Sequence, residues 1–256
     1  MKISNAPIVH PDMYEAVYDH YESWTPNEHA KSLGYRAADM VMRPNVHISD
    51  TVTDSIARLR DENTSIVVAA NHIAVTDPLV VSAAFYQKPI LRPLIKDAIV
   101  GAKSTLFRQD TLPHSLYRRA VETMGSVPVF RPQDHPGHDK LQNTTQRLID
   151  LLVGHLRDGK TVALFPEGSC NEEDPATVLP LKGLLGQVVC RAVSEHMEVA
   201  ILPIGIYYGV AKKRRHAEMV INAPITGNFT KTATVSRLTR LSMQAAVDTA
   251  ISKRTI

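Results

Sequence analysis

Short apolar runs alternate along this chain with longer segments in which apolar residues recur every three or four positions. Runs of the first kind predict strands, at residues 46–48, 65–70, 92–95, 126–130, 161–164, 199–208 and 217–221. Segments of the second kind predict helices, at about residues 52–61, 138–158, 182–195 and 233–252. This alternation is typical of an α/β protein with a mixed central sheet flanked by helices.

Residues 11–42 predict an N-terminal helical segment, made of two helices that separate near Thr25-Pro26-Asn27. Either Thr25 or Asn27 suits the cap of the second helix. The first helix carries an aromatic-rich face, which comprises Met13, Tyr14, Val17, Tyr18, Tyr21 and Trp24. Such a face more often packs on its own protein, but rings with polar tips also suit a membrane surface, and both interpretations stay open.

No repeat, low-complexity tract or linker divides the sequence, so we expect one domain over residues 1–256, with a helical segment at 1–45 and the α/β core at 46–256. Its 44% hydrophobic and 21% charged residues match those of folded globular proteins. The formal charge of +3, with no pattern of basic residues interleaved with stacking aromatics, argues against nucleic acid as a partner.

The two cysteines, Cys170 and Cys190, are too few for a disulfide framework and lack zinc-ligand spacing, which suggests a reducing compartment. Residues 1–7 lack the apolar core of a secretory signal. The apolar stretches near 66–86 and 199–211 are interrupted, and fall short of the roughly 20 apolar residues of a membrane span. We expect a cytoplasmic protein, peripheral on the inner face of the membrane if the aromatic face and the basic run 212–215 contact lipid.

The segment Asn71–Pro78 places a histidine and a carboxylate, His72 and Asp77, five positions apart and directly after a predicted strand. On a continuous helix this spacing would turn the two side chains about 140° apart, so they can meet only if His72 lies in a strand-to-helix turn. Asp77-Pro78 suits a helix that starts at Asp77. A neutral imidazole held in one tautomer by a carboxylate can take a proton from a hydroxyl. By itself the pair fits a histidine beside a helix cap equally well.

Three further segments follow in order: Gly125–Arg131, a short strand that delivers an arginine; Phe165–Ser169, after the apolar residues 161–164; and Val199–Ile206, an apolar strand that contains Pro203. The four motifs together are NHxxxxD, GxxxxxR, FPEG and a proline-bearing strand. In this the chain resembles the glycerolipid acyltransferase family, which includes glycerol-3-phosphate and 1-acylglycerol-3-phosphate acyltransferases. The resemblance covers about residues 66–206 and implies transfer of a fatty acyl group to a hydroxyl.

Acyl transfer from a thioester to an alcohol needs a base for the alcohol, and His72 with Asp77 is the candidate pair. Asp77 would fix the tautomer and stabilise the imidazolium, as in a serine-hydrolase triad. The sequence has no G-x-S-x-G motif, and neither cysteine has a histidine near it in the sequence. We therefore expect direct transfer without an acyl-enzyme, with backbone N–H groups near the turn or the helix start as oxyanion donors.

The resemblance assigns acceptor binding to the GxxxxxR and FPEG segments, which here supply Gly125, Arg131, Glu167, Gly168 and Ser169. An arginine suits a phosphate because its guanidinium can make two parallel contacts. Lys182 matches a basic residue that commonly follows the FPEG motif. The alternative interpretations are an exposed arginine at a strand end and an ordinary polar turn at Glu167-Gly168.

The sequence departs from the family pattern in two places. Phe130 stands where many relatives have an acidic or amide residue before the arginine, and Ser169-Cys170 stands where many have Thr-Arg. The second change removes one expected phosphate partner. The acceptor therefore carries a different headgroup, or Lys182 and another basic residue compensate.

The run Asp134–Asp139 concentrates carboxylates and histidines, but its Pro136-Gly137 predicts a polar loop near the site rather than a metal centre. We assign no metal, and no cofactor besides the acyl-CoA or acyl carrier protein that serves as co-substrate.

We predict an O-acyltransferase that moves a fatty acyl group from acyl-CoA or an acyl carrier protein to a hydroxyl of a glycerophosphate or lysophospholipid, most closely 1-acylglycerol-3-phosphate. A phospholipid–lysophospholipid transacylase has the same motifs but takes intact phospholipid as donor. A non-catalytic lipid-binding protein on the same scaffold is a third alternative. The intact His72, Asp77 and Glu167 disfavour it, because a binding module needs no base.

Overall fold

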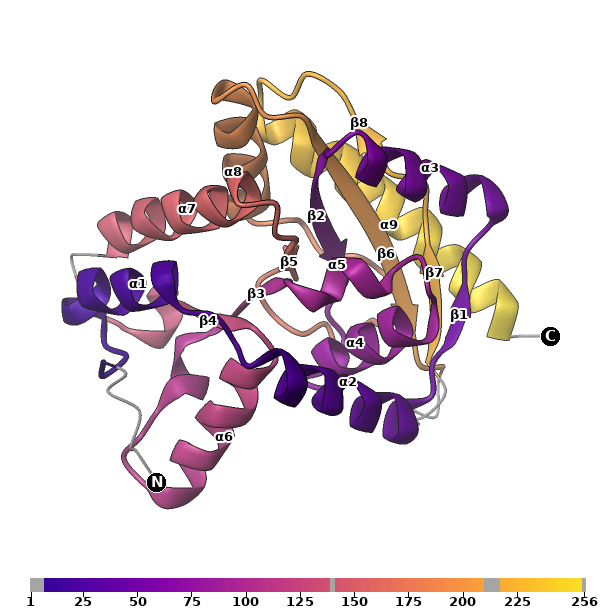
Figure 1. The fold of residues 1–256 in the computed structure, drawn as a ribbon. Helices are drawn as coiled ribbons and strands as arrows, with labels where there is room; N and C mark the ends of the chain where they lie inside the picture. Colours follow the sequence, from indigo (N-terminus) through magenta and orange to yellow (C-terminus); the bar gives the residue numbers. More distant parts are fainter. Residues whose placement is uncertain (1–6, 139–140, 210–216, 255–256) are drawn as a thin grey trace.

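The computed structural model describes residues 7–138, 141–209 and 217–254. Its helices and strands form a mixed α/β arrangement, which confirms the predicted fold class (Figure 1). The helices are α1 (Tyr14–Ser23), α2 (Glu28–Met42), α3 (Asp50–Asp61), α4 (Asp77–Gln87), α5 (Arg92–Lys96), α6 (Leu112–Thr123), α7 (Leu141–Arg157), α8 (Gly183–Ser194) and α9 (Thr232–Arg254). The strands are β1 (Asn45–His47), β2 (Ser65–Ala70), β3 (Ile99–Lys103), β4 (Ser126–Val129), β5 (Val162–Leu164), β6 (Val199–Tyr207), β7 (Glu218–Ile221) and β8 (Ile225–Thr226).

The described strands form one eight-stranded sheet in the order β1-β7-β6-β2-β5-β3-β4, with β8 paired to β6. The strands β6, β2, β5, β3 and β4 are parallel to one another, whereas β7 and β8 run antiparallel to β6. Because parallel strands end at the same edge of a sheet, the segments that follow these five strands lie together there. This edge is the usual ligand position in open α/β sheets.

Alternate side chains of β2 enter two apolar cores, one on each face of the sheet. Val67 and Ala69 share one core with residues of α7, α8 and α9, while Val68 and Ala70 share the other with residues of α2, α3 and α4. Figure 1 shows α9 along one face of the sheet and α4 on the other. Since both faces are covered, β2 is apolar along nearly its whole length.

One predicted strand is wrong. Residues 92–95 lie in helix α5, and the strand of this region, β3, starts at Ile99. Pro93 stands in the first turn of α5, where its missing N–H leaves no intrahelical bond unmade, and Leu94 and Ile95 are both buried. A short apolar run does not distinguish a strand from a turn of buried helix, so the proline was the informative signal.

The aromatic face of α1 belongs to the core. Val17, Tyr18 and Tyr21 are completely buried, and Tyr14 and Trp24 pack against the same core. The Tyr18 hydroxyl donates a hydrogen bond to the carbonyl of Pro128 at 3.2 Å, which ties α1 to β4. The hypothesis that this face contacts a membrane is therefore wrong, and the basic run 212–215 lies outside the described residues.

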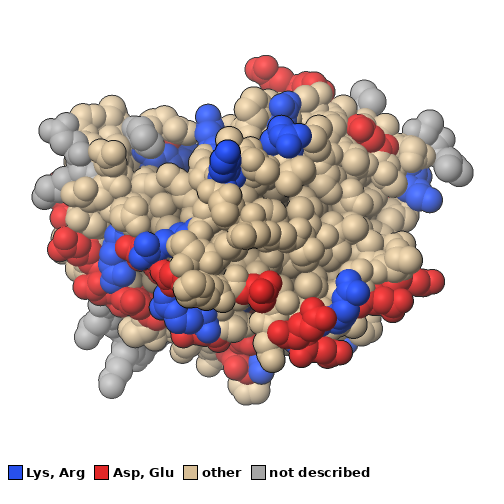
Figure 2. Space-filling view, turned by 90° about the horizontal axis from the view of Figure 1, so that it is seen from above, with Lys and Arg blue, Asp and Glu red and all other residues tan. Residues whose placement is uncertain are grey.

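On the face shown in Figure 2, Lys and Arg lie beside Asp and Glu, and the central area carries few described residues of either kind. Among the described helices, none combines the length and the apolar character that crossing a membrane requires.

The N-terminal pair of helices separates as predicted, with the Asn27 side chain accepting a hydrogen bond from the Ala30 N–H at the start of α2.

Because Tyr18 is completely buried, Tyr18→Ala should lower the free energy of unfolding by about 3–5 kcal/mol, the range for loss of a large buried side chain. Met13→Ala, at a residue that is 45% exposed just before α1, should change it by less than about 0.5 kcal/mol. Urea titration of the two variants measures the difference. Equal effects would contradict the packing of α1 on the core.

Candidate active site

The motif residues gather where the parallel strands end. Each of the five parallel strands supplies a polar residue at or just after its carboxyl end: Tyr208 after β6, His72 after β2, Glu167 and Cys170 after β5, Lys103 at the end of β3, and Arg131 after β4. Two of the four motifs found in the sequence, NHxxxxD and FPEG, thus meet at one edge of the sheet, together with the ends of the other two.

His72 lies in the turn between β2 and α4, and α4 begins at Asp77, as the sequence predicted. The Nδ1 atom of His72 lies 3.0 Å from Oδ2 of Asp77. Side-chain exposure is 18% for His72 and 0% for Asp77. The imidazole therefore turns one nitrogen toward a buried carboxylate, and its other nitrogen, Nε2, points away from that carboxylate.

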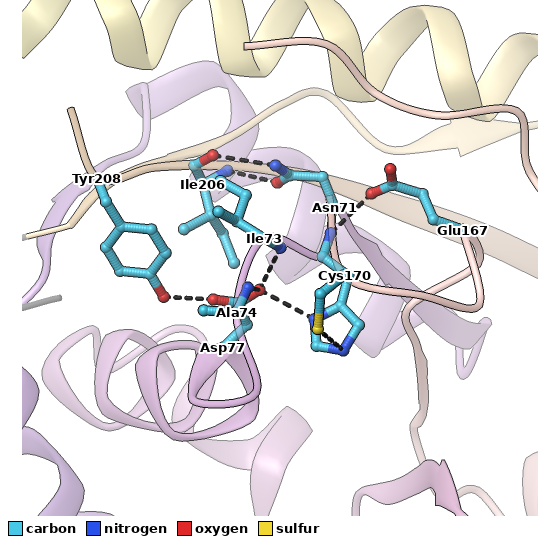
Figure 3. Close-up of polar contacts among 9 residues, drawn as sticks. Asn71, Ile73, Ala74, Asp77, Glu167, Cys170, Ile206 and Tyr208 are labelled. Carbon is cyan, nitrogen blue, oxygen red and sulfur yellow. Dashed lines mark hydrogen bonds and ion pairs between the residues drawn. The ribbon is translucent and has the colours of Figure 1, made fainter. Parts of the chain in front are cut away.

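The Asp77 carboxylate accepts four hydrogen bonds in all (Figure 3). Besides His72, its Oδ2 accepts from the N–H groups of Ile73 at 2.6 Å and Ala74 at 2.9 Å, and Oδ1 accepts from the Tyr208 hydroxyl. A buried carboxylate is tolerated only with such compensation. The N–H groups of Ile73 and Ala74 are thereby occupied, so they do not serve as the oxyanion donors expected near this turn.

Glu167 holds the turn from the side of β5. Its Oε1 accepts from the His72 N–H at 2.7 Å, and Oε2 accepts from the Leu179 N–H at 2.7 Å. The side chain is 1% exposed, and burial raises the pKa of this carboxyl even though both backbone donors oppose the shift. Both oxygens of this buried residue are thus taken by backbone N–H groups, and contact between Glu167 and the acceptor stays a prediction.

Three further bonds fix the same loops. The Asn171 N–H donates to the His72 carbonyl at 2.6 Å, so residues 167 and 171 hold the backbone of His72 from both directions. Asn71 exchanges hydrogen bonds with the backbone of Ile206, accepting at 2.6 Å and donating at 3.0 Å (Figure 3). These contacts continue the β2–β6 pairing past the end of β2 by means of a side chain.

Cys170 lies directly beside the histidine. Its Sγ is 3.3 Å from Nε2 of His72, and the two residues are 98 positions apart in the sequence (Figure 3). Neither cysteine has a histidine near it in the sequence, but the fold brings His72 beside Cys170. The His72 ring also lies against Phe165, with ring centroids 4.5 Å apart, so both its edges and one of its faces have protein contacts.

The pKa of His72 is raised to about 9. Burial by itself lowers this pKa, but the hydrogen bonds with Asp77 and Cys170 and the electrostatic attraction of the same groups outweigh it. These contacts favour the protonated imidazole, and the neutral form that can accept a proton gains population as the pH rises.

Arg131 and Lys182 meet at Gly168. The Arg131 Nη1 donates to the Gly168 carbonyl, and the guanidinium also makes two bonds to Asp134, at 2.7 and 3.1 Å. Gly168 has φ +74°, and a Cβ there would lie 3.1 Å from Cγ of Lys182, so glycine alone fits without strain. Lys103 pairs with the same Asp134 at 3.0 Å. Exposed Ser169 follows Gly168.

Gly125 does not belong to this site. It precedes β4, whereas Arg131 follows β4, so the strand places the two residues at opposite edges of the sheet. Its φ of +84° and the close approach of the Ala98 carbonyl, 2.3 Å from where a Cβ would lie, explain the glycine. The GxxxxxR motif thus contributes its arginine to the site and its glycine to a turn.

Within the described residues, no group of three or more His, Cys, Asp or Glu side chains is arranged to hold a metal ion. Asp134 instead pairs with Arg131 and Lys103, and His135 Nε2 lies 2.8 Å from the Ser104 hydroxyl.

Tyr208, Lys103 and Cys170 were not assigned to the site from the sequence. The contacts of Tyr208 and Cys170 span 131 and 98 residues, and the strand that ends at Lys103 was not among the predicted strands.

Comparison with known proteins agrees with this geometry. A family model described as Acyltransferase matches residues 43–207, more than half of the 256-residue chain. The matched region runs from just before β1 to the end of β6 and contains the motif segments described above. The chain therefore belongs to the glycerolipid acyltransferase family and is an acyltransferase. A search among curated proteins gave no match.

The contacts of His72 predict how it titrates. The titratable groups that face it are the carboxylates of Asp77 and Glu167 and the Cys170 thiol. Cys170→Ala removes one of the contacts that raise the pKa of His72, so its titration midpoint should move from about 9 to lower pH. NMR of the ring nitrogens measures the midpoint, with Cys190→Ala as control. An unchanged midpoint in Cys170→Ala would contradict the contact.

Proposed function

We propose that the protein is an O-acyltransferase that uses a fatty acyl thioester, acyl-CoA or acyl carrier protein, and acylates a hydroxyl of a lysophospholipid or glycerophosphate. The closest acceptor class is 1-acylglycerol-3-phosphate. The observation that carries the proposal is the 3.0 Å contact between Nδ1 of His72 and the buried Asp77, which holds the ring with Nε2 directed away from the carboxylate.

In this reaction His72 takes the proton of the attacking acceptor hydroxyl through Nε2. The buried Asp77 charge stabilises the imidazolium that forms, and its bond to Nδ1 keeps the ring in one orientation. The carboxylate needs no rearrangement, because the N–H groups of Ile73 and Ala74 already hold it in place. The proposed chemistry uses no metal and no cofactor besides the donor.

The charge at the ends of β3, β4 and β5 supports a phosphate on the acceptor. Arg131, Lys103 and Lys182 supply three cations to this edge, and Asp134 balances one of them. Arg131 uses its N–H groups to hold Asp134 and Gly168, so it acts partly as a support. The side chain of Lys182 is exposed and is the more direct candidate for contact with the phosphate.

Exposed apolar side chains beside the base support a lipid substrate. Val75, in the turn between His72 and Asp77, is 69% exposed, and Leu79, in the first turn of α4, is 39% exposed. Apolar surface of this kind suits contact with an acyl chain. We propose these residues, rather than the buried aromatic face of α1, as the contact with lipid.

The base can be tested by two substitutions. His72→Ala should lower turnover by about 10² to 10⁴-fold, the usual contribution of a general base. Asp77→Asn should lower turnover by a similar factor, because the charge that stabilises the imidazolium is lost. The amide can still bond Ile73, Ala74 and Tyr208, so the turn should keep its shape. Transfer from labelled acyl-CoA or acyl carrier protein to a panel of lysolipids, read by mass spectrometry, measures both. A folded His72→Ala protein with wild-type turnover would overturn the mechanism.

The phosphate contact can be tested at Lys182. Lys182→Met should lower kcat/KM for a lysophosphatidic acid acceptor by about 10- to 100-fold, matching the roughly 1.5–3 kcal/mol of a hydrogen bond to a charged group. With monoacylglycerol, which has no phosphate, the loss should be small. Lys96→Met, at an exposed lysine on α5 at the other edge of the sheet, is the matched control. Equal losses with both acceptors would show that Lys182 does not bind phosphate.

A further inference from the structure

Cys170, His72 and Asp77 form a continuous line of contacts. Sγ of Cys170 lies 3.3 Å from Nε2 of His72, and Nδ1 of the same ring lies 3.0 Å from Asp77. This order of thiol, imidazole and carboxylate is that of a cysteine nucleophile activated by an oriented base. We propose that Cys170 takes the acyl group from the thioester donor and passes it to the acceptor, with His72 and Asp77 serving both steps. The inference rests on the acyl transfer proposed above and adds a covalent intermediate to it.

The position of the thiol is fixed by its neighbours. Glu167 accepts from the His72 N–H at 2.7 Å, and the Asn171 N–H donates to the His72 carbonyl at 2.6 Å. The Asn171 side chain in turn donates to the carbonyls of Asp174 and Thr177 at 2.6 and 2.7 Å. Cys170 therefore lies in a segment that is held against the histidine on both sides, which is the preorganisation that a nucleophile needs.

The contact also affects the direct route. An acceptor hydroxyl that gives its proton to His72 must reach Nε2, and Sγ of Cys170 already lies against that atom. Direct transfer would require the thiol to move aside. Transfer through the thiol uses the arrangement as it stands, and partly exposed Cys170 is open to a donor.

Both steps balance. In the first, the Cys170 thiol gives its proton to Nε2 of His72, and Sγ attacks the donor carbonyl carbon. The bond from that carbon to the donor sulfur breaks, and the departing thiolate takes the proton from Nε2. In the second, the acceptor hydroxyl gives its proton to Nε2, and its oxygen attacks the acyl carbon. The bond to Sγ then breaks, and Sγ recovers the proton. The products are an ester and a free donor thiol, and no oxidant or reductant takes part.

The donor half-reaction is tested without any acceptor. Wild-type protein incubated with acyl-CoA, and separately with acyl carrier protein, should gain one acyl group, located by peptide mass spectrometry at Cys170. Neutral hydroxylamine should release it, as expected for a thioester. The protein should also exchange labelled CoA into acyl-CoA. Added lysophosphatidic acid should remove the acyl group from Cys170 at a rate at least equal to the turnover rate.

Substitutions separate the thiol from its surroundings. Cys170→Ala should no longer exchange labelled CoA into acyl-CoA. Its turnover should fall by at least about 100-fold, a modest value for removal of a nucleophile. Cys170→Ser keeps a hydrogen-bonding group beside His72 and should accumulate an acyl-serine that turns over slowly. Cys190→Ala is the matched control, since Cys190 lies on α8 with Thr232 as its polar neighbour at 4.0 Å. It should behave as wild type.

The outcomes distinguish the two proposals. Transfer by wild type without exchange or acylation, or near wild-type transfer by Cys170→Ala while His72→Ala is inactive, would overturn the covalent route and leave the proposed function standing. Acylation of Cys170 without transfer to any lysolipid would support the intermediate and reject the proposed acceptor. Absence of both acylation and transfer with either donor would overturn both proposals.

Discussion

The burial of the Asp77 carboxylate is the constraint on which the rest of the site depends. A charge removed from water is costly unless donors replace the lost solvent. Here those donors come from the turn after β2, from the histidine and from the residue that follows β6. Satisfying the charge therefore fixes the path of the turn, the angle of the imidazole and the relation of both to the neighbouring strand.

A second carboxylate repeats this arrangement on the other side of the turn. Glu167 is buried as well, and both its oxygens accept from backbone N–H groups rather than from side chains. The FPEG motif thus connects the loop after β5 to the loop after β2. The glycine of this motif, Gly168, lets the backbone pass close to Lys182, and the Gly168 carbonyl accepts a hydrogen bond from Arg131. The two recognisable motifs of the sequence form one unit in space.

The sequence predicted what depends on local patterns and recognisable motifs. The strands β2 and β6, the start of α4 at Asp77 and the cap at Asn27 follow from hydrophobic periodicity and helix-capping chemistry, and the structure agrees with them. The pairing of His72 with Asp77 also followed, because their spacing allows it only in a turn. The sequence did not reveal contacts between distant segments. Cys170 and Tyr208 reach the site through strand order, which no local pattern encodes.

One departure from the family pattern lies in the site itself. Cys170, beside His72, stands where many relatives have an arginine. The cations at the ends of the neighbouring strands β3 and β4, Lys103 and Arg131, share Asp134. The position near His72 is then free for a small, polarisable side chain. The cations and the thiol thus occupy two different parts of the same edge of the sheet.

The pairing of β2 with β6 has a consequence for synthesis of the chain. Residues 65–70 align with residues 199–204, so more than a hundred residues are added between the two partners. Until β6 leaves the ribosome, one side of β2 lacks its neighbour, and Tyr208 is not yet present to meet Asp77. The histidine therefore gains its final orientation late, after most of the chain has been made. His72, Asp77 and Cys170 all precede β6 in the chain, so the bond from Tyr208 is the last contact of this group that synthesis makes possible.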